Sequence, residues 1–356
     1  MAFIVTQVER IESFLQRSLR LGILCGVCLV AMAERSGATE SAIGLLYHRF
    51  AESDHPATSL SVEKFSSHIK ELNSGEYTVL PLADLIDKLE KQEPLPKRAV
   101  VITIDDAYVS VYKHAWPLLK KAALPVTLFL TTQPVDSGQQ GYLSWEQLKE
   151  MTGAGVTIGL KAHSQARLST QSPEAIRREI ETASDLVRKN LNVTPVAFAF
   201  PYGLASRQAQ RIVYAAGYKA AFGQHSGVLH RRTDRFFLPR FSFTDAYGDL
   251  KRFRTVVNAA PLPITDLTPS NPLLADADNP PNLGFTVLQN VENLSRLACY
   301  HSKFGKLKLQ RLGTSRIEIR FQKAFPPGRS RINCTMLTPS ARWRWFGMQY
   351  YLPAPQ

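Results

Sequence analysis

Two adjacent aspartates follow an unbroken apolar run in the first third of the chain. Asp105 and Asp106 come directly after residues 99–104, AVVITI, and this β-branched run is typical of a buried strand in a parallel sheet. Neighbouring residues at a strand end point to opposite sides, so we expect one carboxylate to bind a metal and the other to act as a base. A capping aspartate beside a solvated one is the simpler interpretation. The aromatic Tyr108 and Tyr112 just beyond the pair favour a functional site.

Further polar side chains follow other short apolar runs, over residues 45–47, 156–160 and 196–200. In α/β domains, ligands bind at the carboxyl ends of parallel strands, so these positions are the candidates for chemistry. With the two aspartates and Arg240 included, the candidate residues at strand ends are His48, Asp105, Asp106, Lys161, His163, Gln165, Pro201, Tyr202, Gly203 and Arg240.

The elements that must position these side chains alternate regularly across residues 41–256. Buried-strand patterns are separated by helical patterns over residues 62–72, 111–123 and 173–190. Strand, loop and helix recur about every 30 residues, which is typical of a parallel sheet wrapped by helices. The pattern leaves open whether that sheet closes as a barrel.

The composition changes after residue 256. Residues 257–282 are rich in Pro, Asp and Asn and are predicted to be a linker. Residues 283–356 alternate with period two, as in RIEIRF and RWRWFGMQYYL, which predicts a small all-β C-terminal domain. Cys299 and Cys334 lie in its predicted strands, and both a disulfide and two buried thiols are consistent with that placement.

The N-terminus, residues 1–33, has the pattern of an export signal. Three arginines precede the apolar run of residues 21–33, and Ala31 and Ala33 suit cleavage before Glu34. The run is shorter than the roughly 20 residues of a membrane span. We therefore predict an exported protein in the periplasm, cell envelope or medium, with an uncleaved N-terminal membrane anchor as the alternative.

The charge balance is basic, with 43 Lys and Arg against 30 Asp and Glu, a net charge of +13. Such a balance suits anionic partners, but the basic residues are dispersed and no nucleic-acid-binding fingerprint is present, so no specific nucleic acid is expected. The chain also lacks a serine nucleophile elbow, a phosphate-binding P-loop and a dinucleotide fingerprint. Nothing in the sequence indicates an oligomeric state.

Three segments together resemble a known family. VVITIDDAY, VTIGLKAHSQARLS and FAFPYG are similar, in order and spacing, to the three motifs of the polysaccharide deacetylases of carbohydrate esterase family four, the NodB-homology domain. LLYHRF ahead of them and LPRF near residue 240 resemble the poly-N-acetylglucosamine and chitooligosaccharide deacetylase branch. The resemblance covers residues 41–256 and implies a distorted (β/α) barrel.

The resemblance also implies roles. Asp105 would be the general base, His48 the acid that protonates the departing amine, and Asp106 a ligand of a zinc-like divalent metal. The reaction would be hydrolysis of N-acetyl groups on an amino-sugar polysaccharide or oligosaccharide, with the backbone near Tyr202 holding the oxyanion. The substrate-binding residues would be Lys161, Pro201, Tyr202, Gly203 and Arg240.

The second motif departs from the family at its metal ligands. The two histidines expected there are replaced by Lys161 and Gln165. A protonated lysine has no lone pair for a metal, and an amide oxygen is a poor zinc ligand beside imidazole. Three interpretations stay open: a rewired site with Asp106 and His163, joined by His225 or His48; a metal-free site in which Lys161 supplies the positive charge; or a cleft that binds sugar without hydrolysis.

Overall fold

The computed structural model describes residues 39–288 and 291–354. The predicted signal of residues 1–33 lies outside this part of the chain. None of the described helices is both long enough and apolar enough to cross a bilayer. The description below concerns the compact unit that begins at Glu40.

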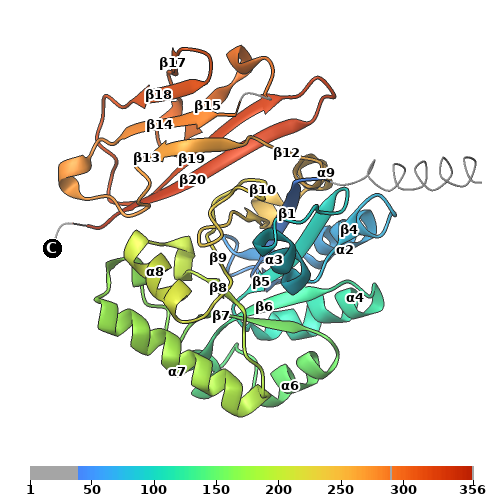
Figure 1. Cartoon of the computed structure of the whole chain (residues 1–356). Helices are drawn as coiled ribbons and strands as arrows, with labels where there is room; N and C mark the ends of the chain where they lie inside the picture. Colours follow the sequence, from blue (N-terminus) through green and yellow to red (C-terminus); the bar gives the residue numbers. More distant parts are fainter. Residues whose placement is uncertain (1–38, 289–290, 355–356) are drawn as a thin grey trace, which may run out of the picture. The chain divides into compact units, whose positions relative to one another are not determined.

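A curved sheet of mainly parallel strands forms the centre of the α/β part (Figure 1). Its order is β10-β1-β5-β6-β7-β8-β9, with β11 beside β1 and β4 beside β5. The bounds are β1 Ser41–Tyr47, β4 Thr78–Val79, β5 Ala99–Asp105, β6 Val126–Thr131, β7 Thr157–Ala162, β8 Ala197–Ala199, β9 Ala220–Phe222, β10 Leu229–His230 and β11 Phe241–Ser242. Every residue of β5 and β6 is buried, as their β-branched and aromatic sequences predict.

One short segment links the two edges of this sheet. Leu238 bridges to Phe222 at the end of β9, and three residues later Phe241 pairs in parallel with Leu45 of β1. The strands therefore run almost completely round, and the predicted distorted (β/α) barrel is confirmed. The same segment carries Arg240 into the interior.

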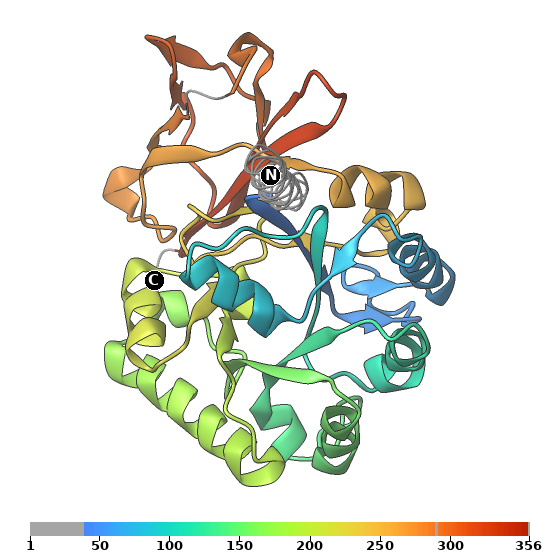
Figure 2. The same cartoon turned by 45° about the vertical axis from the view of Figure 1, so that its right-hand side comes forward.

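Helices cover the outside of the sheet, as Figures 1 and 2 show. They are α2 Val62–Leu72, α3 Leu82–Glu90, α4 Trp116–Lys121, α5 Thr132–Asp136, α6 Trp145–Gly153, α7 Pro173–Leu191, α8 Arg207–Ala215 and α9 Leu250–Val257. The longest, α7, buries a stripe at helical spacing that includes Ile176, Ile180 and Val187. A serine caps its N-terminus, and Ser144 and Gln147 form a capping box on α6.

The C-terminal part is all β, as predicted, and consists of two sheets of order β12-β20-β19-β15-β16 and β13-β14-β18-β17. Phe285 and Phe346, one from each sheet, have ring centroids 5.4 Å apart. The bounds are β12 Ala260–Pro261, β13 Ile264–Thr268, β14 Asn282–Val287, β15 Ala298–His301, β16 Gly305–Lys306, β17 Gln310–Leu312, β18 Arg316–Arg320, β19 Gly328–Leu337 and β20 Trp343–Leu352.

The stretch predicted to be a linker, residues 257–282, belongs to these sheets. β12 pairs with β20 and β13 pairs with β14, each as an edge strand. Proline is tolerated at a sheet edge because the missing N–H faces away from the ladder, which is why a Pro-rich composition did not exclude strands here.

Cys299 and Cys334 lie directly opposite each other on β15 and β19 and form a disulfide. The sequence left open whether these cysteines form a disulfide or stay as two buried thiols, and the structure has the disulfide.

Candidate active site

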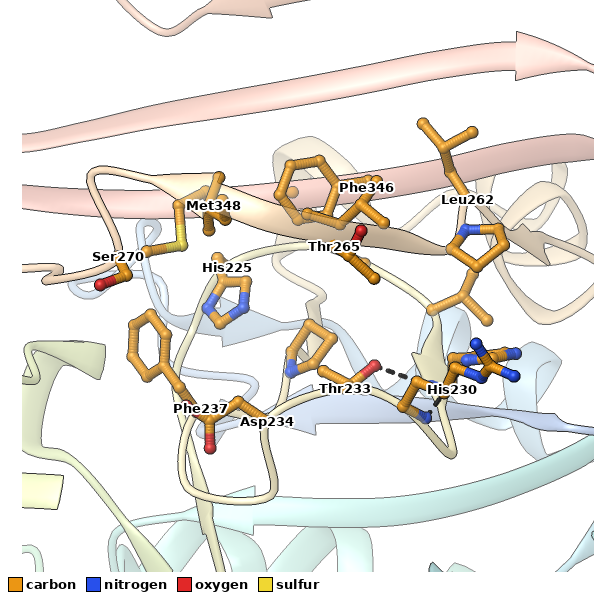
Figure 3. A pocket seen from close by; sticks show the side chains of 18 of the residues that line it. His225, His230, Thr233, Asp234, Phe237, Leu262, Thr265, Ser270, Phe346 and Met348 are labelled. Atoms are coloured by element: carbon orange, nitrogen blue, oxygen red, sulfur yellow. Dashed lines mark hydrogen bonds between the residues drawn. The ribbon is translucent and has the colours of Figure 1, made fainter. Parts of the chain in front are cut away.

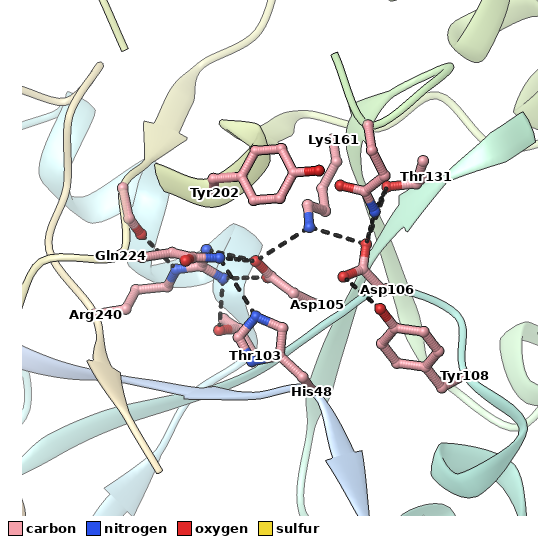
Figure 4. Close-up of polar contacts among 12 residues, drawn as sticks. His48, Thr103, Asp105, Asp106, Tyr108, Thr131, Lys161, Tyr202, Gln224 and Arg240 are labelled. Atoms are coloured by element: carbon pink, nitrogen blue, oxygen red, sulfur yellow. Dashed lines mark hydrogen bonds and ion pairs between the residues drawn. The ribbon is translucent and has the colours of Figure 1, made fainter. Parts of the chain in front are cut away.

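Asp105 is the last residue of β5 and is completely buried. Its two carboxylate oxygens accept hydrogen bonds from both terminal nitrogens of Arg240, at 2.6 and 3.0 Å (Figure 4). Arg240 is itself fully buried and also donates to Thr103 Oγ1 at 3.0 Å. This bidentate pair fixes the orientation of the carboxylate.

Asp106 has a left-handed backbone, with φ +66°, and its carboxylate accepts from four donors. Lys161 Nζ, Gln165 Nε2 and Thr131 Oγ1 lie 2.9, 3.0 and 3.0 Å from Oδ1, and Tyr108 Oη lies 3.4 Å from Oδ2. Three of these donors crowd Oδ1, and the ammonium among them brings a positive charge that opposes a metal ion at this carboxylate.

Lys161 lies between the two aspartates and is 2% exposed. Its Nζ is 2.9 Å from Asp106 Oδ1 and 3.7 Å from Asp105 Oδ2. The expectation that the carboxylates point to opposite sides is therefore wrong: both face one ammonium (Figure 4). The left-handed backbone of Asp106 explains this, because it interrupts the alternation that extended strand geometry would impose.

The cations set the protonation of the centre. Burial would raise the pKa of Asp105, but the charges of Arg240 and Lys161 outweigh it and hold that pKa well below its usual range. Burial would likewise lower the pKa of Lys161, and the two carboxylates reverse this and raise it. Asp105 and Lys161 are therefore a buried pair that is charged at neutral pH, with Arg240 and Asp106 bonded to them.

His48 lies on the other side of Asp105, and Gln224 joins the two. Gln224 Nε2 is 3.2 Å from Asp105 Oδ2 and 3.4 Å from His48 Nε2, while His48 Nδ1 is buried without a hydrogen-bond partner among the described residues. Burial lowers the pKa of His48, and the neighbouring Asp105 opposes this only in part. The structure thus brings the predicted acid and base together.

Pro201, Tyr202 and Gly203 form a tight turn after β8, as the search at strand ends expected. Tyr202 has φ +58° and its side chain is 38% exposed. Gly203 has φ +68°, and a Cβ there would lie 2.5 Å from the backbone nitrogen of Gln224, so this position requires glycine. The carbonyls of Tyr202 and Gly203 accept from Gln349 of β20, at 3.3 and 3.0 Å.

Two histidines of the rewired-metal interpretation lie elsewhere. His163 Nδ1 is 3.1 Å from Thr132 Oγ1, and its ring lines a surface hollow with Glu179. His225 lines a cavity of about 200 Å³ with Phe237 and Met348 (Figure 3), where burial lowers its pKa to about 3.

Over residues 39–288 and 291–354, no three His, Cys, Asp or Glu side chains gather where they could hold a metal ion. The predicted metal ligands Asp106 and His163 do not belong to such a group in this part of the chain. Together with the donors already on Asp106, this means that the residues present do not fit the family's zinc-like ion.

The sequence analysis missed three residues of the centre, Thr103, Thr131 and Gln224. It also did not foresee that Tyr108 donates a hydrogen bond to Asp106. A strict search of strand ends would have found two of them. Thr131 is the last residue of β6, and Gln224 follows β9 by two positions, in a loop where only His225 was considered.

Comparisons with known proteins show what the α/β part of the chain is similar to. Residues 92–221 match the family model described as "Polysaccharide deacetylase". A poly-beta-1,6-N-acetyl-D-glucosamine N-deacetylase of Staphylococcus aureus is 27% identical over 201 residues, covering 52% of this chain and 68% of the relative.

Two solved structures share the fold. The deacetylase PplD of Streptococcus pyogenes aligns with 22% identity and a TM-score of 0.57, covering 61% of this chain and 98% of that one. IcaB of Ammonifex degensii aligns with 23% identity and a TM-score of 0.56, covering 62% and 98%. Residues 92–221 therefore contain a polysaccharide deacetylase domain, and the α/β part of the chain shares the fold of these solved deacetylases.

Proposed function

We propose that this protein removes N-acetyl groups from an amino-sugar polymer, and that the ammonium of Lys161 supplies the fixed positive charge for which relatives use a divalent metal. The observation that carries the proposal is the position of Lys161 Nζ, buried and within 2.9 and 3.7 Å of the two aspartates. A desolvated cation held in place by carboxylates can stabilise a developing oxyanion without reorganising during the reaction.

The proposed reaction uses side chains that lie within reach of one another. Asp105 accepts a proton from a water molecule as the water oxygen adds to the acetyl carbonyl carbon. The carbonyl oxygen becomes an oxyanion facing Lys161. Solvent passes the proton from Asp105 to the neutral imidazole of His48, and the lowered pKa of His48 makes the resulting imidazolium a stronger acid. The C–N bond then breaks with its electron pair on nitrogen, which takes that proton from His48. The products are acetic acid and an amine, and transfer of the acid proton to the amine gives acetate and an ammonium group.

A second candidate is sugar binding without hydrolysis. The carboxylate of Asp105 already accepts from Arg240 twice and from Gln224, and its lowered pKa makes it a weak base. This observation favours a domain that has retained the cleft of its family and lost the chemistry.

Acetate release from N-acetylglucosamine oligomers, measured with a chelator present, separates the candidates. We expect release that resists the chelator, and a loss of about a hundredfold or more in Lys161→Met, in line with the removal of one oxyanion-stabilising group. Lys189→Met, at an exposed lysine of α7, is the matched control. Binding without acetate release would establish the second candidate, and release that stops with chelator and returns with zinc would refute the metal-free proposal.

Metal content gives a readout independent of activity. Lys161→His combined with Gln165→His restores the two imidazoles that the family pattern has at these positions. We expect about one zinc ion per chain in this double variant and none in the wild-type protein. A stoichiometric zinc ion in the wild type would contradict the ligand argument above.

The disulfide supports export as the setting for this activity. Disulfides persist in oxidising compartments and are rare in the cytosol, so the Cys299–Cys334 bond favours a periplasmic, envelope or secreted location. An amino-sugar polymer outside the cytoplasm is the partner that fits both the fold and the compartment.

A further inference from the structure

Two shallow hollows adjoin each other beside the candidate active site. Their volumes are about 470 and 500 Å³, and both are lined by Arg167, Tyr202, Tyr351 and Ala354. Because they share these four residues, they form one continuous groove. At one end the lining includes Gln165, which donates to Asp106, so the groove begins at the catalytic centre.

The other end of the groove lies on the C-terminal β domain. Arg329 of β19 and Tyr351 of β20 line it, and the two residues are directly opposite each other in the β19–β20 ladder. Gln349 of the same strand donates to the carbonyls of Tyr202 and Gly203. The β domain therefore completes the groove and is tied to the turn that carries Tyr202.

The charged side chains that line the groove are all positive. Arg167 and Arg329 are both exposed, and neither has an ion pair in the part of the chain that the structure describes. The described lining includes no carboxylate. Arg167 also contacts an aromatic ring, since its Cζ lies 5.7 Å from the centre of the Tyr202 ring.

Two tyrosine side chains accompany these cations. Tyr202 is 38% exposed and Tyr351 is half-buried, so each offers part of an aromatic surface to the groove. A sugar chain passing along the groove would meet an aromatic ring and a guanidinium on each domain. Guanidinium groups pair with carboxylates in a fixed bidentate geometry, which gives preference for an anionic ligand.

We infer that this groove binds the sugars next to the reacting residue and selects an amino-sugar polymer that also contains carboxylate-bearing sugars. Arg167 and Arg329 bind the carboxylates, and the β domain is a part of the substrate site. This inference rests on the proposed function for the identity of the reacting sugar, but it makes a separate statement about binding.

The test compares two probes of equal length on the full chain. A hyaluronan hexasaccharide contains N-acetylglucosamine and a carboxylate sugar in alternation, whereas chitohexaose is neutral. By calorimetry at low salt we expect the hyaluronan probe to bind roughly fivefold to tenfold more tightly, the size expected for two exposed ion pairs. The preference falls as salt is raised, because exposed charges are screened.

The double variant Arg167→Ala, Arg329→Ala should lose this preference while its affinity for chitohexaose stays within about twofold. Arg211→Ala, at an exposed arginine of α8 that lines neither hollow, is the matched control and should retain it. Tyr351→Ala should weaken both probes. Equal binding of the probes by the wild type, a preference retained in the double variant, or no binding of either probe would overturn the inference. Absence of acetate release would instead count against the proposed hydrolysis and leave these binding results standing.

Discussion

The candidate active site and the adjoining groove each present two cationic side chains, buried in the first and exposed in the second. Arg240 and Lys161 are 0% and 2% exposed, and each pairs with a buried aspartate. Arg167 and Arg329 are exposed and have no ion pair in the described chain. Burying an unpaired charge is costly, so the first two cations require protein partners, whereas water satisfies the second two.

This difference separates what each pair of cations can do. The charges of the centre neutralise one another, two against two, and their positions are fixed before any ligand arrives. The charges of the groove are free for a ligand, and salt at physiological strength screens them over about 8 Å. Under the proposed function, the centre would act on one acetamide group and the groove would bind the sugar chain that carries it.

The largest effect that would test this comparison comes from removing Arg240. Arg240→Ala leaves Asp105 buried without its bidentate partner, and we expect the free energy of unfolding to fall by about 3–5 kcal/mol. Urea denaturation followed by circular dichroism measures this. Asp105→Leu combined with Arg240→Met removes both charges and should be less destabilising than Arg240→Ala alone. If Arg240→Ala changed stability by no more than a surface variant does, the centre would not depend on its internal pairing.

A smaller effect appears on acidification. The pKa of Asp105 is lower in the folded protein than in the unfolded chain. Its contribution to the free energy of unfolding is therefore fully present at pH values above the unfolded pKa, and it is lost as the pH falls towards the folded pKa. With an unfolded pKa of about 3.9, the stability difference between wild type and Asp105→Asn should shrink by about 1 kcal/mol from pH 5 to pH 3. Urea titrations of both proteins at the two pH values measure it. A difference that stays constant would mean that the Asp105 carboxylate is not stabilised by its partners.

The fold was predictable from the sequence because its strands are buried on both faces. Residues 99–104 and 196–200 are short apolar runs that end in polar residues, and this pattern located Asp105, Tyr202 and the barrel around them. The β strands of the C-terminal domain were equally visible in their alternation. Strands β12 and β13 were not, because edge strands tolerate prolines that otherwise indicate a linker.

The arrangement of the centre was predictable only in part. Replacement of the two expected histidines by Lys161 and Gln165 could be seen in the sequence, but not that both would donate to Asp106. That contact depends on the left-handed backbone of Asp106, which no pattern of residue types indicates. His163 and His225 were candidates because of residue type and position in a loop, but His163 hydrogen-bonds with Thr132 and His225 lines a separate cavity.

The smallest effect concerns the groove and completes the contrast with Arg240. Arg329→Ala and Arg167→Ala should each change the free energy of unfolding by no more than about 0.5 kcal/mol, at low and at high salt, because no ion pair is broken. Urea denaturation of both variants beside Arg240→Ala provides the measurement. Of the two, Arg167→Ala should have the larger effect because it loses a contact with the Tyr202 ring, whereas Arg329→Ala relieves repulsion in a chain of net charge +13. A loss above about 1 kcal/mol in either variant would mean that these arginines stabilise the fold, and they would then no longer be free to bind a ligand.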